Sequence, residues 1–251
     1  MPESKAKVYS ETNKGLKRPN NEDEAGSIDR GEFQLVLVAD GMGGHSSGEV
    51  ASRIAKETIL EEMKNIPAPK NVRVAKREIK RAIKHANTLI HKLSSKKAEC
   101  YGMGTTLVMA YRQDDYTIII NCGDSRAYSF TSAEGKGLVQ LTVDQTIVQY
   151  LYKLGAISKE EIETSPKRHI LMNALGIDPS VSYDVSIIKN DYDMILTCSD
   201  GLTNMVTDAQ LEKLINSNLD KDPESLTKIL IQEALDKGGI DNIGVSILEV
   251  R

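Results

Sequence analysis

Short apolar runs of strand length recur along the chain and predict a protein rich in β-structure. Leu35–Ala39 is the first of them. The stretches Thr105–Tyr111, Tyr116–Cys122 and Arg126–Phe130 follow, and the short turns between them indicate antiparallel neighbours. The strand pattern returns at Val181–Ile188, Met194–Cys198 and Ile243–Val250.

Helical periodicity separates these strand groups. One amphipathic helix is expected over Ser46–Met63, with a capping box of Ser46 and Glu49, and a second from Asn71 to about Leu93. Near the C-terminus, a Thr207–Gln210 capping box marks a third helix. Asp222 as N-cap, with Pro223 at the first helical position, marks a fourth.

Residues 142–178 differ from both patterns, with short helical stretches, a Ser158–Glu161 capping box and little strand signal. They suggest a flap or insertion beside a site. Because strands and helices come in groups, we predict an α+β fold in which helix pairs flank two antiparallel sheets. A length of 251 residues is compatible with a single domain.

Composition narrows the function classes. The formal net charge is -4, and the scattered basic residues give no reason to expect nucleic acid. No apolar run approaches the ~18 residues of a membrane span, and no secretory signal is visible, so we expect a cytoplasmic protein that spans no membrane. Lys and Arg line the second helix, and two interpretations stay open: a solvated face or a docking surface. The odd number of cysteines favours buried thiols over disulfides.

The chemical signal lies in where carboxylates follow apolar strands. Asp40 and Asp200 share one form, an apolar run followed by Asp-Gly, and Asp124 and Asp241 lie in Gly- or Asn-containing turns. The turn-rich residues after Asp40 are expected to end their strand. A single such Asp commonly caps a turn. Several of them, together with Glu22 and Asp23, predict a carboxylate cluster at adjacent strand ends.

Oxygen ligands without Cys or His at metal spacing favour Mg²⁺ or Mn²⁺ over zinc. A shared carboxylate can bridge two such ions about 3.5–4 Å apart, a pair that activates water and binds a phosphoryl group. Gly41 permits close backbone approach, so its carbonyl is a further candidate ligand. Arg18, four residues before Glu22, is the candidate phosphate-binding side chain.

These motifs, in this order, resemble the bacterial branch of the type 2C protein phosphatases, the metal-dependent PPM Ser/Thr phosphatases. They extend over residues 18–242. The matching stretches are Arg18–Asp23, Val38–His45, Gly48–Ser52, Gly104–Thr106, Gly123–Tyr128, Leu141–Asp144, Ala174–Gly176, Ser199–Leu202 and Asp241–Asn242.

The resemblance implies a role for each matching residue. Asp40 would bridge two metal ions, with Glu22 and the Gly41 carbonyl on the second and Asp200 and Asp241 on the first. Asp124 and Asp200 would form a third, weaker metal site. Arg18 would bind the substrate phosphate, and Asp23 and Asn242 would orient metal-bound water. The catalytic set implied is Arg18, Asp40 and Asp200.

The resemblance also implies a fold and an activity. The fold would be a four-layer αββα sandwich, a single catalytic domain over residues 1–251 with a flap at about 145–178. The activity would be hydrolysis of phosphoserine and phosphothreonine on proteins by a water that bridges the metals. A Ser/Thr protein kinase would be the opposing enzyme in signalling, and a monomer is the default state.

Three positions depart from the family pattern. Met42 stands where many eukaryotic members carry a His proposed as general acid, and His45 is the nearby candidate proton donor. Gln145 replaces the usual His after Asp144, and Asn173 replaces the usual Arg before Ala174. These departures make flap contacts and substrate preference the least certain inference.

Two alternatives to protein phosphatase activity stay open. A catalytically weak regulator that binds phosphoproteins would be indicated by loss of a metal-binding carboxylate, and none is lost here. A phosphatase of small phosphorylated metabolites would be distinguished by comparing phosphopeptide with small-phosphoester turnover.

Overall fold

A computed structural model describes residues 6–44 and 47–250 of the chain. The strands are β1 (Lys7–Asn13), β2 (Asp23–Asp29), β3 (Phe33–Met42), β4 (Gly104–Thr105), β5 (Leu107–Gln113), β6 (Tyr116–Cys122), β7 (Arg126–Thr131), β8 (Gly137–Gln140), β9 (Asp184–Lys189), β10 (Met194–Cys198) and β11 (Ile243–Glu249). The helices are α1 (Ser47–Lys64), α2 (Val72–Lys96), the 3₁₀ turn η1 (Ala98–Cys100), α3 (Ile147–Lys153), α4 (Lys159–Thr164), α5 (Asp200–Thr203), α6 (Asp208–Ser217) and α7 (Pro223–Asp236).

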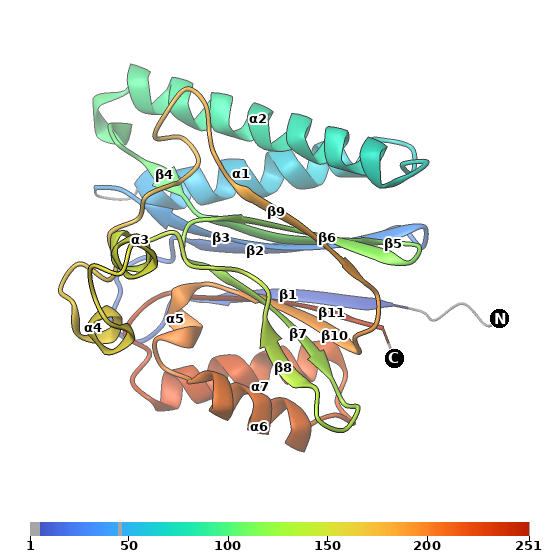
Figure 1. Cartoon of the computed structure of the whole chain (residues 1–251). Coiled ribbons are helices and arrows are strands. Elements are labelled where there is room, and N and C mark those ends of the chain that lie inside the picture. Colours follow the sequence, from blue (N-terminus) through green and yellow to red (C-terminus); the bar gives the residue numbers. More distant parts are fainter. Residues whose placement is uncertain (1–5, 45–46, 251) are drawn as a thin grey trace.

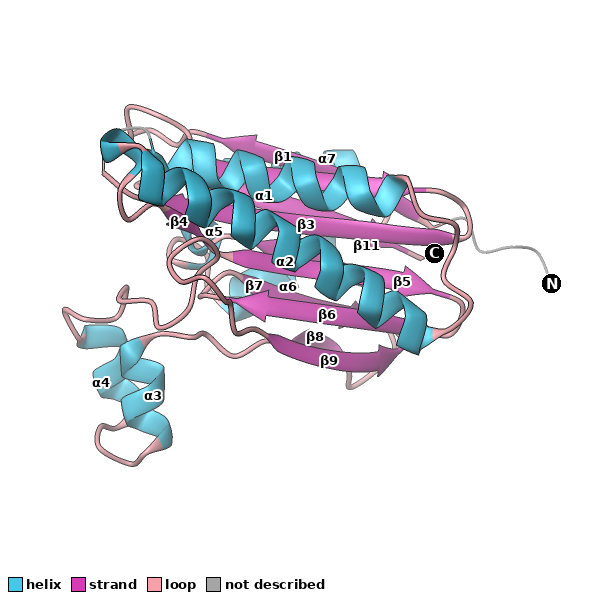
Figure 2. Cartoon of the chain, turned by 90° about the horizontal axis from the view of Figure 1, so that it is seen from above, coloured by secondary structure: helices cyan, strands magenta, loops and turns pink. Residues whose placement is uncertain are grey.

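Two antiparallel sheets pack face to face between two helix pairs (Figure 1). One sheet has the order β2-β3-β5-β6-β9, with the short β4 on β3, and α1 and α2 cover its outer face (Figure 2). The other has the order β1-β11-β10-β7-β8, and α6 and α7 lie outside it. The predicted layer order is confirmed.

The hydrophobic core has three parts that follow these layers. The first lies between α1, α2 and their sheet and includes Phe33, Ile83 and Tyr111. The second lies between α6, α7 and the other sheet. The third joins the two sheets and consists mostly of small or β-branched residues, such as Val38 and Ile195. Small side chains at this interface allow the sheets to approach closely.

Several elements were not predicted. The strands β1, β2 and β8 have mixed or polar sequences, and their burial is incomplete, so they lack an apolar run. The expectation that the segment after Asp40 cannot continue a strand is wrong. β3 runs on to Met42 because Gly41 and Met42 pair with Thr105 and Gly104 of β4. The proposed N-cap Ser46 lies outside the described residues.

The other helix caps agree with the sequence pattern. Ser158 with Glu161 and Thr207 with Gln210 form capping boxes, and Asp222 caps α7. The helices α3 and α4 lie in the predicted flap, which extends away from the sandwich at one end (Figure 2).

The outer face of α2 carries the basic stripe. Arg77 and Arg81 pair with Glu78, and Arg81 also contacts Glu62 of α1, so part of this charge is compensated within the protein. Among the described residues, no helix is long and apolar enough to cross a membrane. All three cysteines are buried free thiols.

Candidate active site

An open cavity of about 1420 Å³ lies at the end of the sandwich beside α5 and the flap. Residues from both sheets line it. All the predicted site residues except Asp23 are among them: Arg18, Glu22, Asp40, Gly41, Asp124, Asp200, Asp241 and Asn242. The structure therefore brings together carboxylates that lie more than 200 positions apart in the sequence.

Backbone hydrogen bonds fix Asp40 at the end of β3. Its N–H donates to Thr106 Oγ1 (3.0 Å), and its carbonyl accepts from the Thr106 N–H (2.8 Å) and from Thr105 Oγ1 (2.9 Å). The next N–H, that of Gly41, donates to the Glu22 carbonyl (3.0 Å). A Cβ on Gly41 would lie 2.1 Å from the Gly48 carbonyl oxygen, so only glycine permits this crossing of β3 and α1.

Glu22 is positioned from the far end of the chain. Its N–H donates to Asn242 Oδ1 (2.8 Å), and the Asn242 amide donates to the carbonyls of Lys14 and Asn20, both at 2.8 Å. Asn242 thus shapes the loop that carries Arg18 and Glu22. Burial raises the pKa of the Glu22 carboxyl, although Arg18 and the Gly48 N–H oppose this shift.

Asp23 lies behind the cavity wall, paired in register with Asp40. It is 2% exposed, and its Oδ2 accepts a hydrogen bond from Ser199 Oγ (2.6 Å). Its other oxygen, Oδ1, is buried and has no hydrogen-bond partner among the described residues. Burial, together with the nearby charges of Asp200 and Asp241, raises the Asp23 pKa to about 8.

The remaining carboxylates lie close enough to repel one another. Burial raises the pKa of Asp40 well above its ordinary value, and the charges of Asp23, Asp200 and Asp124 add to the effect. Burial and the charge of Asp200 raise the pKa of Asp124 to about 7. The cavity therefore disfavours the ionised form of these carboxyl groups unless positive charge is added.

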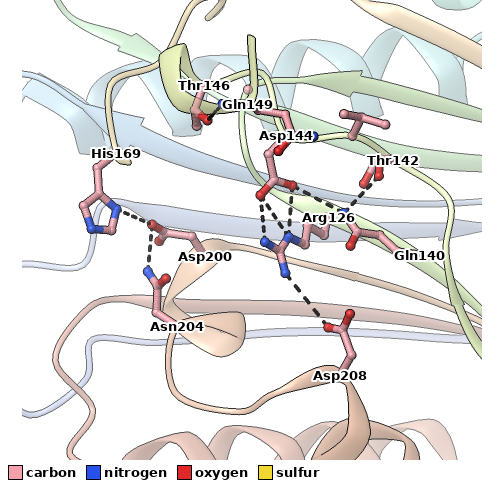
Figure 3. Close-up of polar contacts among 12 residues, drawn as sticks. Arg126, Gln140, Thr142, Asp144, Thr146, Gln149, His169, Asp200, Asn204 and Asp208 are labelled. Carbon is pink, nitrogen blue, oxygen red and sulfur yellow. Dashed lines mark hydrogen bonds and ion pairs between the residues drawn. The ribbon is translucent and has the colours of Figure 1, made fainter. Parts of the chain in front are cut away.

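Two basic side chains contact these carboxylates. Arg18 Nη2 lies 2.8 Å from Asp241 Oδ2, and the Arg18 side chain is 51% exposed. His169, on the flap, has its Nδ1 3.7 Å from Asp200 Oδ2, and Asn204 donates a hydrogen bond to the same carboxylate at 3.0 Å (Figure 3). The interaction with Asp200 raises the pKa of the His169 imidazole.

The donors suit a hard divalent cation. They are carboxylate and carbonyl oxygens, the preferred ligands of Mg²⁺ and Mn²⁺, and the unpartnered Asp23 Oδ1 and the mutual repulsion favour added positive charge. As the side chains stand, no three His, Cys, Asp or Glu residues within 6–44 and 47–250 are grouped so that they could hold an ion. Side-chain movement, including release of Asp241 by Arg18, would have to accompany binding.

Some contributors were not predicted from the sequence. Ser199 and Thr106 position Asp23 and Asp40 through hydroxyl groups. Arg126 forms a two-pronged ion pair with Asp144, at 2.9 Å and 2.7 Å, at the cavity wall (Figure 3). His169 was missed because it is a single His within a flap that shows no metal-ligand spacing. The candidate proton donor His45 lies outside the described residues, and Met42 lines the cavity.

Comparison with known proteins agrees with this geometry. Residues 17–230 match the family model described as Protein phosphatase 2C. The chain belongs to the protein phosphatase 2C family. It is 35% identical over 240 residues to the serine/threonine phosphatase stp of Listeria monocytogenes, an alignment that covers 95% of this chain and 93% of that one.

Solved structures of phosphatases share the fold of this family member. Stp1 of Staphylococcus aureus superposes with a TM-score of 0.86 at 33% identity, covering 98% of this chain and 95% of that chain. The catalytic domain of the phosphatase PstP, solved with two manganese ions, gives a TM-score of 0.81 at 30% identity and 97% coverage of both chains. The family and the fold predicted from the sequence motifs are confirmed.

The two flap departures from the family pattern bond to each other in this phosphatase. Asn173 Nδ2 donates to Gln145 Oε1 (3.2 Å), which also accepts from the Gly123 N–H (3.1 Å). Gln145 Nε2 donates to Asp184 Oδ2 (2.9 Å). The side chains at the two departing positions therefore form one shared contact at the base of the flap.

Proposed function

We propose that this chain is a metal-dependent protein phosphatase that hydrolyses phosphoserine and phosphothreonine on proteins by direct attack of water. The observation that carries the proposal is the convergence of Glu22, Asp40, Asp124, Asp200 and Asp241 on one cavity. No single element supplies this set, and the chain is similar to named Ser/Thr phosphatases over nearly its full length.

Two Mn²⁺ or Mg²⁺ ions would bind in a core site at this cavity, and a third ion would bind beside them. Asp40 would be shared by the core ions, with Glu22 and the Gly41 carbonyl on one side and Asp200 and Asp241 on the other. Asp124 with Asp200 would form the third position. When bound, the ions would supply a water of lowered pKa and positive charge opposite the phosphoryl oxygens.

The residues of the chain perform the remaining tasks. Arg18 would exchange its Asp241 partner for a substrate phosphate, to which a guanidinium can donate two parallel hydrogen bonds. Asn242 and Thr106 hold the loop and strand end that carry Glu22 and Asp40. The Asp23 carboxyl, held by Ser199, would orient water at the site.

A phosphoenzyme intermediate is not part of this proposal. The thiol of Cys198, two residues before Asp200, is fully buried, and burial raises its pKa to about 12, so it carries almost no thiolate at neutral pH. Water is then the nucleophile, and transfer occurs in one displacement.

The cellular role follows from the reaction class. The substrates would be phosphoproteins of the cytoplasm, and a Ser/Thr kinase would oppose the enzyme. We propose a monomeric, single catalytic domain with a flap at about 145–178, the segment that contains α3 and α4.

The deciding experiment measures phosphate release from a phosphothreonine peptide across a Mn²⁺ titration. We expect release that requires Mn²⁺, stops with chelator and falls at least about a thousandfold in Asp200→Asn. Asp220→Asn, an exposed carboxylate outside the site, is the matched control. Failure of the wild type to release phosphate from peptides, despite Mn²⁺ binding, would favour a binding regulator. Turnover of small phosphoesters alone would favour a metabolite phosphatase.

A further inference from the structure

The edge strand β9 begins beside the cavity and is the most exposed strand of the described chain. Val181 and Ser182 line the cavity, and β9 starts shortly after them, at Asp184. Asp184 pairs with Asn121, close to the end of β6 that leads into the cavity. The strand therefore runs from the cavity toward the opposite end of its sheet, along an edge that Figure 2 shows beyond α2.

The outer side of β9 presents backbone groups that its own sheet does not use. The sheet ends at β9, so within residues 6–44 and 47–250 only β6 pairs with it. In an antiparallel pair, alternate residues direct both their N–H and their C=O toward the partner strand. The Asn190 N–H donates to the Asp115 carbonyl (3.1 Å) in continuation of the same register. This alternation directs the backbone groups of Val185, Ile187 and Lys189 away from β6.

Apolar side chains follow the same edge at every second position. Val181 and Tyr183, before the strand, pack in part against the core between this sheet and its helices. Val185 and Ile187 lie opposite β6 residues of that core, yet they are 41% and 48% exposed. The apolar row thus starts at the cavity wall and continues along the exposed edge.

The centre of β9 lacks the usual protection against further pairing. Edge strands commonly carry a proline, a central lysine or a bulge. The centre of β9 reads Val-Ser-Ile-Ile, with charges only at Asp184 and Lys189, and its register with β6 is continuous. Free donors and acceptors beside an alternating apolar row are the features to which an extended peptide adds as a further strand.

We propose that β9 binds an extended segment of the phosphoprotein substrate as an added strand, while the phosphorylated side chain occupies the cavity. This inference rests on the proposed function. Continuity identifies the occupant, since a peptide that leaves the cavity past Val181 meets the start of β9 directly. The path from Val181 to Ile187 corresponds to roughly 20 Å of extended chain, or about six residues on one side of the phosphoresidue. Backbone hydrogen bonds would supply affinity, and the apolar row would favour β-branched side chains at alternate positions.

The first test compares phosphothreonine peptides of different length on the Mn²⁺-loaded full chain. The short peptide has about three residues on each side of the phosphothreonine. Two longer peptides add about eight residues of alternating valine and serine, one on the N-terminal and one on the C-terminal side. Because only one side of a bound peptide can follow β9, we expect one extension to lower KM about tenfold or more and the other less than about twofold.

N-methylation of single amides in the better peptide distinguishes strand pairing from simple apolar contact. An amide that donates to β9 loses its hydrogen bond on methylation, whereas the amides on either side of it point away from β9. We therefore expect the gain in KM to be lost at alternate positions. An equal gain from both extensions, no gain from either, or losses without alternation would overturn the inference.

The second test changes the protein. The Ile187 N–H points away from β6, so Ile187→Pro removes an outward donor and keeps the inner pairing. We expect this variant to lose at least about fivefold of the long-peptide gain, and Ile187→Thr, which retains the N–H, to keep most of it. Circular dichroism checks both folds. Hydrogen exchange at Val185 and Ile187 in the wild type should slow when the long peptide is added, and unchanged exchange would contradict the proposal even if Ile187→Pro does not fold.

The two proposals fail in different ways. Phosphate release from the short peptide, with no effect of length, would refute the role of β9 and leave the phosphatase proposal intact. Slowed exchange at Val185 and Ile187 without phosphate release from any peptide would refute the phosphatase proposal, although β9 would still bind peptide.

Discussion

Five carboxyl groups lie at the cavity, those of Glu22, Asp40, Asp124, Asp200 and Asp241, and two basic side chains contact them directly. Arg18 and His169 each pair with one of them. Burial, and then the repulsion among these groups, raises the pKa values of Glu22, Asp40 and Asp124. A site of this kind costs free energy of folding when it holds no cation, and bound cations relieve that cost.

The first prediction concerns pH and metal removal. The folded-state pKa values of Asp23 (about 8) and Asp124 (about 7) lie above the value near 4 of the unfolded chain. The contribution of these two groups to the free energy of unfolding is therefore fully present below about pH 4 and is lost as the pH rises through 7 and 8. One such group lowers the free energy of unfolding by about 1.4 kcal/mol per pH unit. In chelator, we expect a melting temperature several degrees lower at pH 8 than at pH 6.

Scanning calorimetry with and without Mn²⁺ checks this prediction. Excess Mn²⁺ should remove most of the difference between pH 6 and pH 8, and Asp23→Asn should reduce it in the metal-free protein. A metal-free melting temperature that rises with pH over this interval would contradict the argument.

The second prediction concerns Arg18. Because its guanidinium now binds Asp241, replacement by alanine removes a phosphate donor and also frees a candidate metal ligand. We expect Arg18→Ala to lower kcat/KM for a phosphothreonine peptide about ten- to a hundredfold. The Mn²⁺ affinity should be unchanged or higher. Arg18→Lys keeps the positive charge but not the planar guanidinium, so its kcat/KM should lie between those of the wild type and Arg18→Ala. An unaltered KM in Arg18→Ala would argue against phosphate binding.

At the scale of elements, the flap depends on its base. Gln145 connects the turn at Gly123, the amide of Asn173 and the carboxylate of Asp184. The flap helices α3 and α4 project from the sandwich (Figure 2), and this contact joins the base of the flap to the sheet.

The third prediction tests that contact. Gln145→Ala leaves the Gly123 N–H and the Asn173 amide without their partner, which should cost about 1–3 kcal/mol of unfolding free energy. Asn173→Ala should cost less. In urea titrations, the double variant should be more stable than the sum of the single effects predicts, with a coupling of about 0.5 kcal/mol or more. Additive effects would mean that the two side chains act independently.

Elements differ in how well the sequence predicts them. Tyr116–Cys122 and Met194–Cys198 carry apolar runs and were located at their observed bounds. β1 and β8 have no such run, since one side of each faces solvent or polar groups, and local pattern cannot reveal a strand that long-range pairing stabilises. Asp40 was placed before a turn for the same reason: its strand continues only because β4, more than 60 residues away, pairs with it.

The same limit applies to the site. The carboxylates were found because the strand ends that carry them are recognisable in the sequence, and the motif order identified the family. The pairings of Arg18 with Asp241 and of His169 with Asp200 join residues that no local pattern connects. They depend on how the two sheets and the flap come together.

At the scale of the whole molecule, the site forms because the two sheets pack face to face in a fixed relative position. Asp40 belongs to one sheet, and Asp200 and Asp241 follow or precede strands of the other. The interface between the sheets is thin, and Ile195 of β10 is fully buried within it.

The fourth prediction addresses this interface. Ile195→Ala removes buried volume between the sheets and should cost about 2–5 kcal/mol of unfolding free energy. The matched control is Val139→Ala on β8, where the side chain is 51% exposed and the change should stay within about 0.5 kcal/mol. If the two variants unfold at the same urea concentration, the sheet interface does not hold the sandwich together.

The pairing of β1 with β11 also sets an order of assembly during synthesis. Among the strands of residues 6–44 and 47–250, β1 leaves the ribosome first, yet its one partner within its sheet is β11, which emerges last. The sheet that carries Asp40 draws on residues 23–189 and can form earlier. A growing chain can therefore place Asp40 and Gly41 in a folded sheet while Asp200 and Asp241 await the last strand, and phosphatase activity can begin only once β11 has joined its sheet.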